Sequence, residues 1–119
     1  MPLKTRSIYE KAEEDEGYRV LVMRYWPRGV RRNAVDVWEK NLGTEPDLIE
    51  AWKEGEVTWQ EFVKRYRASV APQGAKIAEL AQRSKKETVT LLCSCREENR
   101  CHRSVLKELI GGAVRQGRT

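Results

Sequence analysis

The chain lacks any long apolar run, and no apolar stretch follows its N-terminal methionine. A helix that spans a bilayer needs about 20 consecutive apolar residues, and a secretory signal peptide needs an apolar segment near its start. Neither feature is found, so the sequence predicts a cytoplasmic protein with no membrane partner. A chain of 119 residues has room for one domain, and we expect a single domain over residues 1–119.

Cysteine and histidine are scarce and lie together. The three cysteines are Cys93, Cys95 and Cys101, and His102 is the single histidine. An odd number of cysteines in a chain without a secretion signal argues against the disulfide framework of a small secreted protein. The spacing is poor for zinc, because adjacent ligands can hardly both reach one metal. We therefore predict neither a metal site nor another cofactor, and a Cys95–Cys101 disulfide in a redox-sensing or structural domain remains an alternative.

Asparagine is also rare, with three residues, whereas 34% of all residues are charged. This balance is typical of thermophilic proteins, in which intracellular disulfides are tolerated. The net charge is +5, and its excess is mostly arginine. The clustered arginines are Arg24, Arg28, Arg31 and Arg32, and then Arg96, Arg100 and Arg103. A guanidinium suits phosphate or carboxylate, so we expect an anionic partner, with a solvated basic face as the plain alternative.

Patterns of apolar residues predict an α/β fold. The strands are expected at Lys4–Tyr9, Tyr18–Trp26 and Glu87–Cys93, where apolar and β-branched residues run together. The helices are expected over Val35–Leu42, after a Thr44 cap, after a Thr58–Glu61 capping box, from Pro72, and over Cys101–Ile110. Long helical connections between strands predict a small, mostly parallel sheet flanked by helices.

Two segments are expected to stay unpacked. Glu10–Gly17 contains four consecutive acidic residues from Glu13 to Glu16, whose mutual repulsion argues against burial. The Gly111-Gly112 pair is expected to end the last helix. Residues 112–119 would then form a frayed basic tail.

The candidate site lies where two strands end. The basic loop Trp26–Asn33 follows one buried strand, and the loop Ser94–Arg100 follows another. Ligands of open parallel sheets bind beyond the carboxyl ends of the strands, so the two loops are expected to meet if their strands are neighbours. The helix that begins near Cys101 adds backbone donors and a partial positive charge, which also stabilise a thiolate.

This arrangement predicts a site for a small anionic ligand, with thiol-dependent catalysis as an added feature. His102 would serve as acid or base, and Cys101 or Cys95 as nucleophile. The predicted ligand-binding residues are Arg24, Trp26, Arg28, Arg100, Arg103 and Ser104. The Cys-x5-Arg spacing of phosphatase loops is absent. The alternative in another class is a nucleic-acid-binding accessory protein that uses its arginine-rich face on phosphates.

Two long motifs resemble a known family. The segment Tyr18–Val30 is similar to the signature of the YeaO-like branch of the DUF488 family, whose function is unknown. Leu91-Leu92-Cys93 followed by Cys101-His102-Arg103 resembles the signature of the wider family. The resemblance implies a compact α/β fold and supplies no activity to transfer.

The chain departs from the family pattern at two positions. Met23 stands where similar members carry aspartate, and Cys95 stands where they often carry an acidic residue. Both changes remove a negative charge from the predicted site. If the site binds an anion, we expect the loss of these charges to tighten it.

Overall fold

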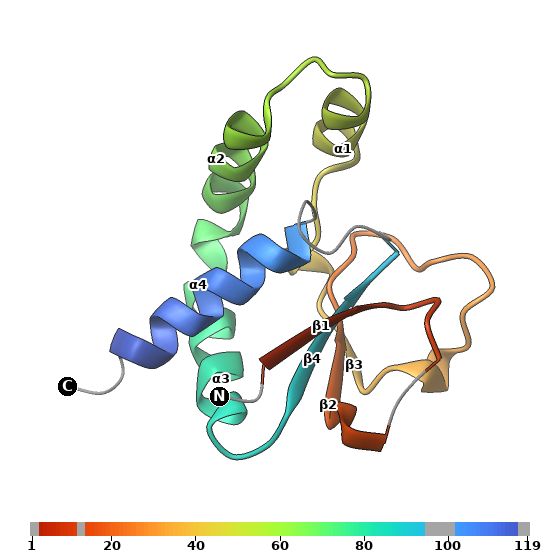
Figure 1. The fold of residues 1–119 in the computed structure, drawn as a ribbon, viewed down its shortest axis with the longest axis vertical. Helices are drawn as coiled ribbons and strands as arrows, with labels where there is room; N and C mark the ends of the chain where they lie inside the picture. The colour runs from red at the N-terminus through yellow and green to blue at the C-terminus, as the bar shows by residue number, and fades with distance from the viewer. Residues whose placement is uncertain (1–2, 12–13, 95–101, 117–119) are drawn as a thin grey trace.

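Four parallel strands form one sheet at the centre of the fold (Figure 1). The computed structural model describes residues 3–11, 14–94 and 102–116. The strand order is β1-β4-β2-β3, with β1 at Leu3–Ser7, β2 at Tyr18–Leu21, β3 at Val37–Trp38 and β4 at Val89–Cys93. Each neighbouring pair is parallel. The prediction of an α/β fold with a mostly parallel sheet is confirmed.

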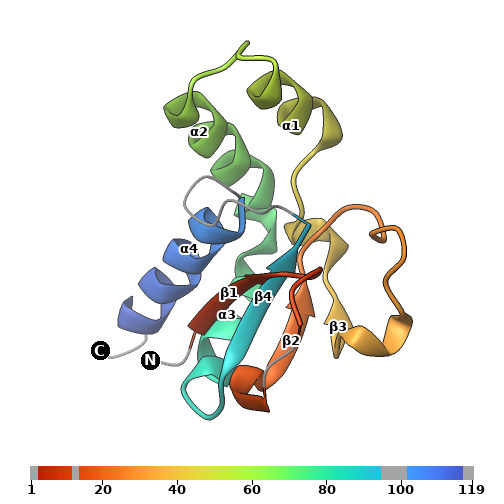
Figure 2. The same ribbon diagram turned by 45° about the vertical axis from the view of Figure 1, so that its right-hand side comes forward.

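The last two α-helices lie along one face of this sheet, and the first two form a hairpin that extends away from it (Figures 1 and 2). The α-helices are α1 at Pro46–Lys53, α2 at Trp59–Val70, α3 at Gly74–Ser84 and α4 at His102–Gln116, with short 3-10 helices at Glu14–Glu16, Arg32–Ala34, Lys40–Leu42 and Ala71–Gln73. Val89 and Leu91 of β4 join the helical side chains in the main core. None of the helices in the described part of the chain has both the length and the apolarity needed to cross a membrane.

The opposite face of the sheet is covered by loop residues instead of helices. Ile8, Leu21 and Leu92 form a second core cluster there. The partly buried side chains packed on it, Trp26 and Trp38 among them, come from the segment between β2 and the 3-10 helix at Lys40–Leu42. The side chains of Leu91 and Leu92 therefore pack on opposite faces of the sheet, as the alternation of side chains along a strand requires. All five residues of β4 are buried.

The prediction of a helix over Val35–Leu42 is wrong. Val37 and Trp38 pair in parallel with Val20 and Leu21 and form the edge strand β3. The Trp38 indole Nε1 also donates to the Met23 carbonyl oxygen at 2.7 Å. These contacts with a neighbouring segment override a weak helical periodicity, as tertiary contacts often do.

The prediction that the acidic connection stays unpacked is wrong for Glu16. This side chain is 1% exposed, and its carboxylate lies 3.0 Å from both Arg6 Nε and Arg19 Nε. Two guanidinium groups offset the cost of burying one carboxylate. The Glu16 carboxylate therefore pairs with arginines of β1 and β2 on the loop-covered face of the sheet.

The prediction about the C-terminal helix needs a similar correction. Helix α4 passes through Gly111-Gly112 and ends at Gln116, so a tail beginning at residue 112 is wrong, and residues 117–119 lie outside the described ranges. A glycine costs a helix only about 1 kcal/mol, and the buried Ile110 and Gly111 show that this part of α4 packs on the protein.

The two helix caps have different outcomes. Thr58 Oγ1 accepts a hydrogen bond from the Glu61 backbone nitrogen at 3.1 Å, so the Thr58 cap of α2 is confirmed. Thr44 does not cap α1, because Glu45 occupies the cap position. Thr44 is instead buried at the end of the preceding segment.

Candidate functional site

Strands β2 and β4 are parallel neighbours, with Leu21 opposite Leu92. The segments that follow them therefore leave from the same edge of the sheet, which is the geometry that the sequence predicts for the site. The structure describes the second segment up to Ser94 and again from His102. The predicted site residues Cys95, Arg100 and Cys101, and with them the Cys95–Cys101 disulfide, lie outside the described residues.

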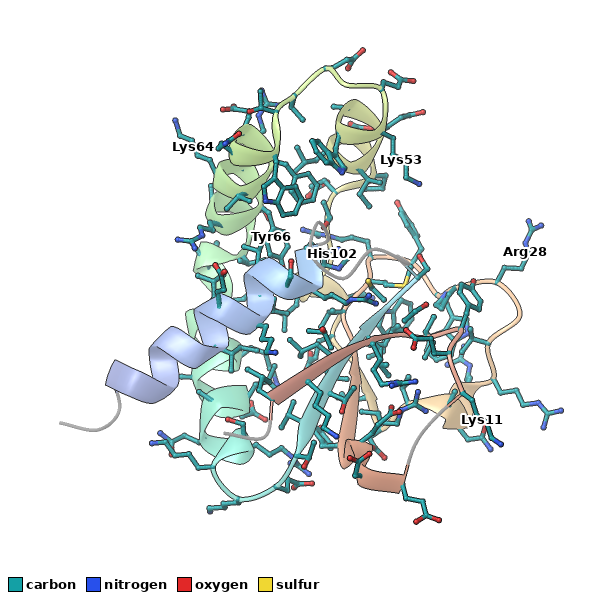
Figure 3. All side chains as sticks on the ribbon, in the orientation of Figure 1. Lys11, Arg28, Lys53, Lys64, Tyr66 and His102 are labelled. Atoms are coloured by element: carbon teal, nitrogen blue, oxygen red, sulfur yellow. The ribbon has the colours of Figure 1, made fainter. Side chains whose placement is uncertain are left out.

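His102 opens α4 and ties this helix to the end of β2. Its side chain is 4% exposed, and its Nε2 lies 2.5 Å from the Val22 carbonyl oxygen. Because a carbonyl oxygen only accepts, Nε2 carries the proton of this hydrogen bond. The imidazole also packs near the Tyr66 ring, with centroids 5.6 Å apart (Figure 3). The geometry assigns His102 a positioning contact, and its acid or base role stays a prediction.

Arg103 is the most unusual residue at this edge. It is 1% exposed and is the largest of the fully buried side chains in the described ranges. Its Nη1 donates to the Cys93 sulfur, with Nη1 and Sγ 3.5 Å apart. Its Nε is buried and has no hydrogen-bond partner. The arginine ion pairs found within the described ranges involve other arginines, and none of them joins Arg103 to a carboxylate.

Burying a guanidinium in this way is costly. Removing a charged group from water costs several kcal/mol unless a counter-charge and hydrogen bonds replace its hydration. A thiol is only a weak acceptor, so Cys93 offsets little of this cost. Helix α4 has 15 residues and begins at His102, so its first turn adds partial positive charge and orphan N–H donors. Among the described residues, the Arg103 guanidinium and the first turn of α4 thus place positive charge at this edge, and the acceptor that Arg103 contacts is the Cys93 sulfur.

The other predicted ligand-binding residues lie in different settings. Arg24 is already engaged, because its Nε donates to the Gly43 carbonyl and its Nη2 pairs with Glu45, both at 3.2 Å. The Trp26 indole donates to the Val30 carbonyl at 2.8 Å and thereby shapes its own loop. Arg28 is exposed and points away from His102 (Figure 3).

Ser104 is half-buried in the first turn of α4. The structure therefore brings His102, Arg103 and Ser104 together in one turn, next to Cys93 through the Arg103 contact. It does not place Arg28 with them.

Sequence reasoning missed several residues at this edge. Tyr66 is not among the predicted site residues, yet its hydroxyl donates to the Leu42 carbonyl at 2.7 Å and its ring lies beside His102. Thr44 is buried, and its Oγ1 has no hydrogen-bond partner. Gly43 fits so closely against the segment that follows β2 that a Cβ would lie 2.4 Å from the Arg24 nitrogen. None of these contacts has a spacing that a single sequence displays.

A cavity of about 300 Å³ lies elsewhere, beside β1. Its lining includes Lys4, Arg6, Asp15, Glu16 and Lys107. Most of these charges neutralise one another, since Lys4 pairs with Asp15 and Arg6 with Glu16. This cavity therefore carries no argument for a ligand. No cluster of three metal-ligating side chains occurs among the residues that the structure describes.

The fold and this edge define a small parallel α/β protein with an electropositive strand–helix junction. A family model described as "Active DUF488-N3 subclade" matches residues 3–113. The chain belongs to the DUF488 family. It is 33% identical over 112 residues to the uncharacterized protein YeaO of Escherichia coli (strain K12), an overlap that covers 92% of this chain and 97% of that protein.

A mycobacterial relative gives the same picture. The uncharacterized protein Rv3073c of Mycobacterium tuberculosis (strain ATCC 25618 / H37Rv) is 31% identical over 112 residues, covering 92% of this chain and 94% of its own. No solved structure matches the chain. The family membership anticipated from Tyr18–Val30 and Cys101-His102-Arg103 is confirmed.

Proposed function

We propose that the chain binds a small anion, carried by a phosphate or carboxylate group, at the Arg103 guanidinium. The observation that carries this proposal is the buried Nε of Arg103, which has no hydrogen-bond partner. A bound anion would supply the missing counter-charge and would accept from the Nε edge of the guanidinium, an edge suited to bidentate contact. The first turn of α4 would add backbone donors.

Two features of the chain support a charged ligand over a neutral one. The neighbouring acceptor is a thiol and not a carboxylate, so none of the carboxylates in the described ranges competes with a ligand for Arg103. The departures from the family pattern at Met23 and Cys95, where similar members usually or often carry an acid, would also favour an anion. The description of the matching subclade as active fits a working site in this family. A catalytic step would use His102 with Cys101 or Cys95.

The burial of Arg103 sets a kinetic expectation. A side chain that is 1% exposed accepts a ligand only when the groups that cover it move aside. We therefore expect association well below the diffusion limit, as is usual when binding requires a conformational change. Stopped-flow mixing with inorganic phosphate would measure this rate.

Calorimetric titration with inorganic phosphate, sulfate and acetate tests the proposal. We expect the wild-type chain to bind at least one of these anions, and Arg103→Met to lose at least 90% of that affinity. Arg67→Met is the matched control, because Arg67 is half-exposed and pairs at the surface with Glu108. Equal loss in both variants, or no binding by the wild type, would refute the proposal.

The variant Cys93→Ala tests whether the positive charge of Arg103 is balanced by a Cys93 thiolate. If the Cys93 sulfur were a thiolate counter-ion, its removal would leave the guanidinium unpaired and anion affinity would rise sharply. If the sulfur is a neutral thiol, as we propose, the affinity of Cys93→Ala for phosphate should stay within about threefold. The redox alternative, a Cys95–Cys101 disulfide, is tested by counting free thiols before and after reduction.

A further inference from the structure

A second basic surface lies away from the Arg103 site, on the loop that covers the non-helical face of the sheet. Arg28, Arg31 and Arg32 are exposed within five positions, and none of them forms an ion pair with a described carboxylate. No aspartate or glutamate occurs between Gly17 and Val35. The loop therefore presents positive charge without an internal counter-charge.

The shape of this loop is fixed by contacts on both sides. The Trp26 indole donates to the Val30 carbonyl at 2.8 Å, and the Tyr9 hydroxyl donates to the Arg28 carbonyl at 3.1 Å. Gly29 supplies the left-handed turn with φ +80°. A loop held in this way loses little conformational entropy on binding, which favours affinity.

Aromatic rings accompany the arginines. Tyr9 is 57% exposed and Tyr25 is 70% exposed, and they are the large apolar side chains most open to solvent in the described ranges. Tyr25 lies at the start of the loop, and Tyr9 contacts its middle through Arg28. Tyrosine is enriched at interfaces because its ring is apolar and its hydroxyl is polar. Exposed tyrosines beside arginines that form no ion pair with a described carboxylate therefore indicate a partner with both flat apolar faces and negative charges.

Single-stranded nucleic acid has this chemistry. Its unpaired bases stack on aromatic side chains, and its phosphates pair with arginine. A duplex keeps its bases stacked inside and would use only the arginines. An anionic membrane would also attract the arginines and accept tyrosine rings at its interface, but the described residues of the loop include no amphipathic α-helix that could insert there. We propose that the loop carrying Tyr25, Arg28, Arg31 and Arg32, together with the adjoining Tyr9, binds single-stranded RNA or DNA without reading its sequence.

This surface is distinct from the candidate anion site. Arg28 points away from Tyr66 and His102 in Figure 3, and the Arg103 guanidinium is buried. The inference therefore does not depend on the proposed function. Arg103→Met should bind oligonucleotides as the wild type does.

Fluorescence anisotropy with labelled dT12, rU12 and a 12-base-pair duplex tests the inference. We expect both single strands to bind more tightly than the duplex at low salt. Tyr25→Ala should weaken binding to single strands at least about fivefold, the lower end for one stacked base, and Tyr25→Phe should restore it. Equal binding of duplex and single strands, with no effect of Tyr25→Ala, would overturn the inference.

Paired charge variants test the role of the loop arginines. R28Q/R31Q should lower the slope of log affinity against log salt by about 1.4, since each phosphate contact contributes about 0.7 for single strands. K53Q/K64Q is the matched control, because Lys53 and Lys64 are exposed on the α1–α2 hairpin (Figure 3). An equal effect of both variants, or binding to phosphatidylserine vesicles without binding to dT12 or rU12, would contradict the inference.

Discussion

Replacing Arg103 with methionine should change the stability of the protein in opposite directions with and without an anion. In low-salt HEPES buffer the wild-type chain buries a guanidinium whose one described partner is a thiol. Replacing even a buried ion pair by apolar side chains of similar volume is often neutral or stabilising by about 1–4 kcal/mol, and a buried charge without a counter-charge is costlier still. We therefore expect Arg103→Met to raise the free energy of unfolding by about 2 kcal/mol in this buffer.

Phosphate should reverse that order. A ligand that binds only the folded state stabilises it by RT ln(1 + [L]/Kd), about 2.7 kcal/mol at 100 times Kd and 4.1 kcal/mol at 1,000 times Kd. The wild-type chain gains this free energy and Arg103→Met does not. A deficit of 2 kcal/mol is recovered at roughly 30 times Kd, above which the wild type becomes the more stable protein.

Urea unfolding at constant ionic strength, with phosphate replacing chloride, measures both free energies. Arg67→Met should change stability by no more than about 0.5 kcal/mol in either buffer, as is usual for a surface ion pair. A loss of more than 2 kcal/mol for Arg103→Met in low-salt HEPES would refute the reasoning. That result would mean that groups of the protein already compensate the guanidinium.

Further substitutions test the fold. Gly43→Ala should destabilise the fold by about 1–3 kcal/mol, because the added Cβ would lie 2.4 Å from a backbone nitrogen. A Cβ at Gly74 would meet no atom within 4 Å, so Gly74→Ala should stabilise the fold by about 0.4–1 kcal/mol. Chemical denaturation compares the two variants. Glu16→Ala should cost about 3–5 kcal/mol, since it leaves two arginines without their shared carboxylate, and a cost below 1 kcal/mol in thermal unfolding would contradict this. Thr58→Ala should cost about 1 kcal/mol through the lost helix cap, with Thr58→Ser as the variant that retains stability.

Strong local patterns predicted most of the fold. The continuous apolar run at β4 and the capping residue Thr58 carry their information within a few positions, so the sequence alone identifies them. The Val35–Leu42 error arose because β3 depends on pairing with Val20 and Leu21, which lie far away in the sequence. A two-residue edge strand has too few positions to show a period of its own.

The candidate site was predicted in outline only. Parallel strands bring the segments after β2 and β4 to one edge, so the position of the site follows from topology. The state of each arginine does not, because an arginine in the first turn of a helix is ordinarily exposed. Whether a guanidinium is buried like Arg103, paired like Arg24 with Glu45 or exposed like Arg28 depends on three-dimensional neighbours.

The Arg103 Nε–H group is the most direct probe of the central claim. In an NMR titration with inorganic phosphate, the ¹⁵N–¹H cross-peak of this group, assigned by its absence in Arg103→Met, should shift and saturate. The cross-peak of the surface residue Arg67 should stay within the change caused by ionic strength alone. An Arg103 cross-peak that does not move, while phosphate binds elsewhere or not at all, would contradict the claim that this buried guanidinium holds an anion.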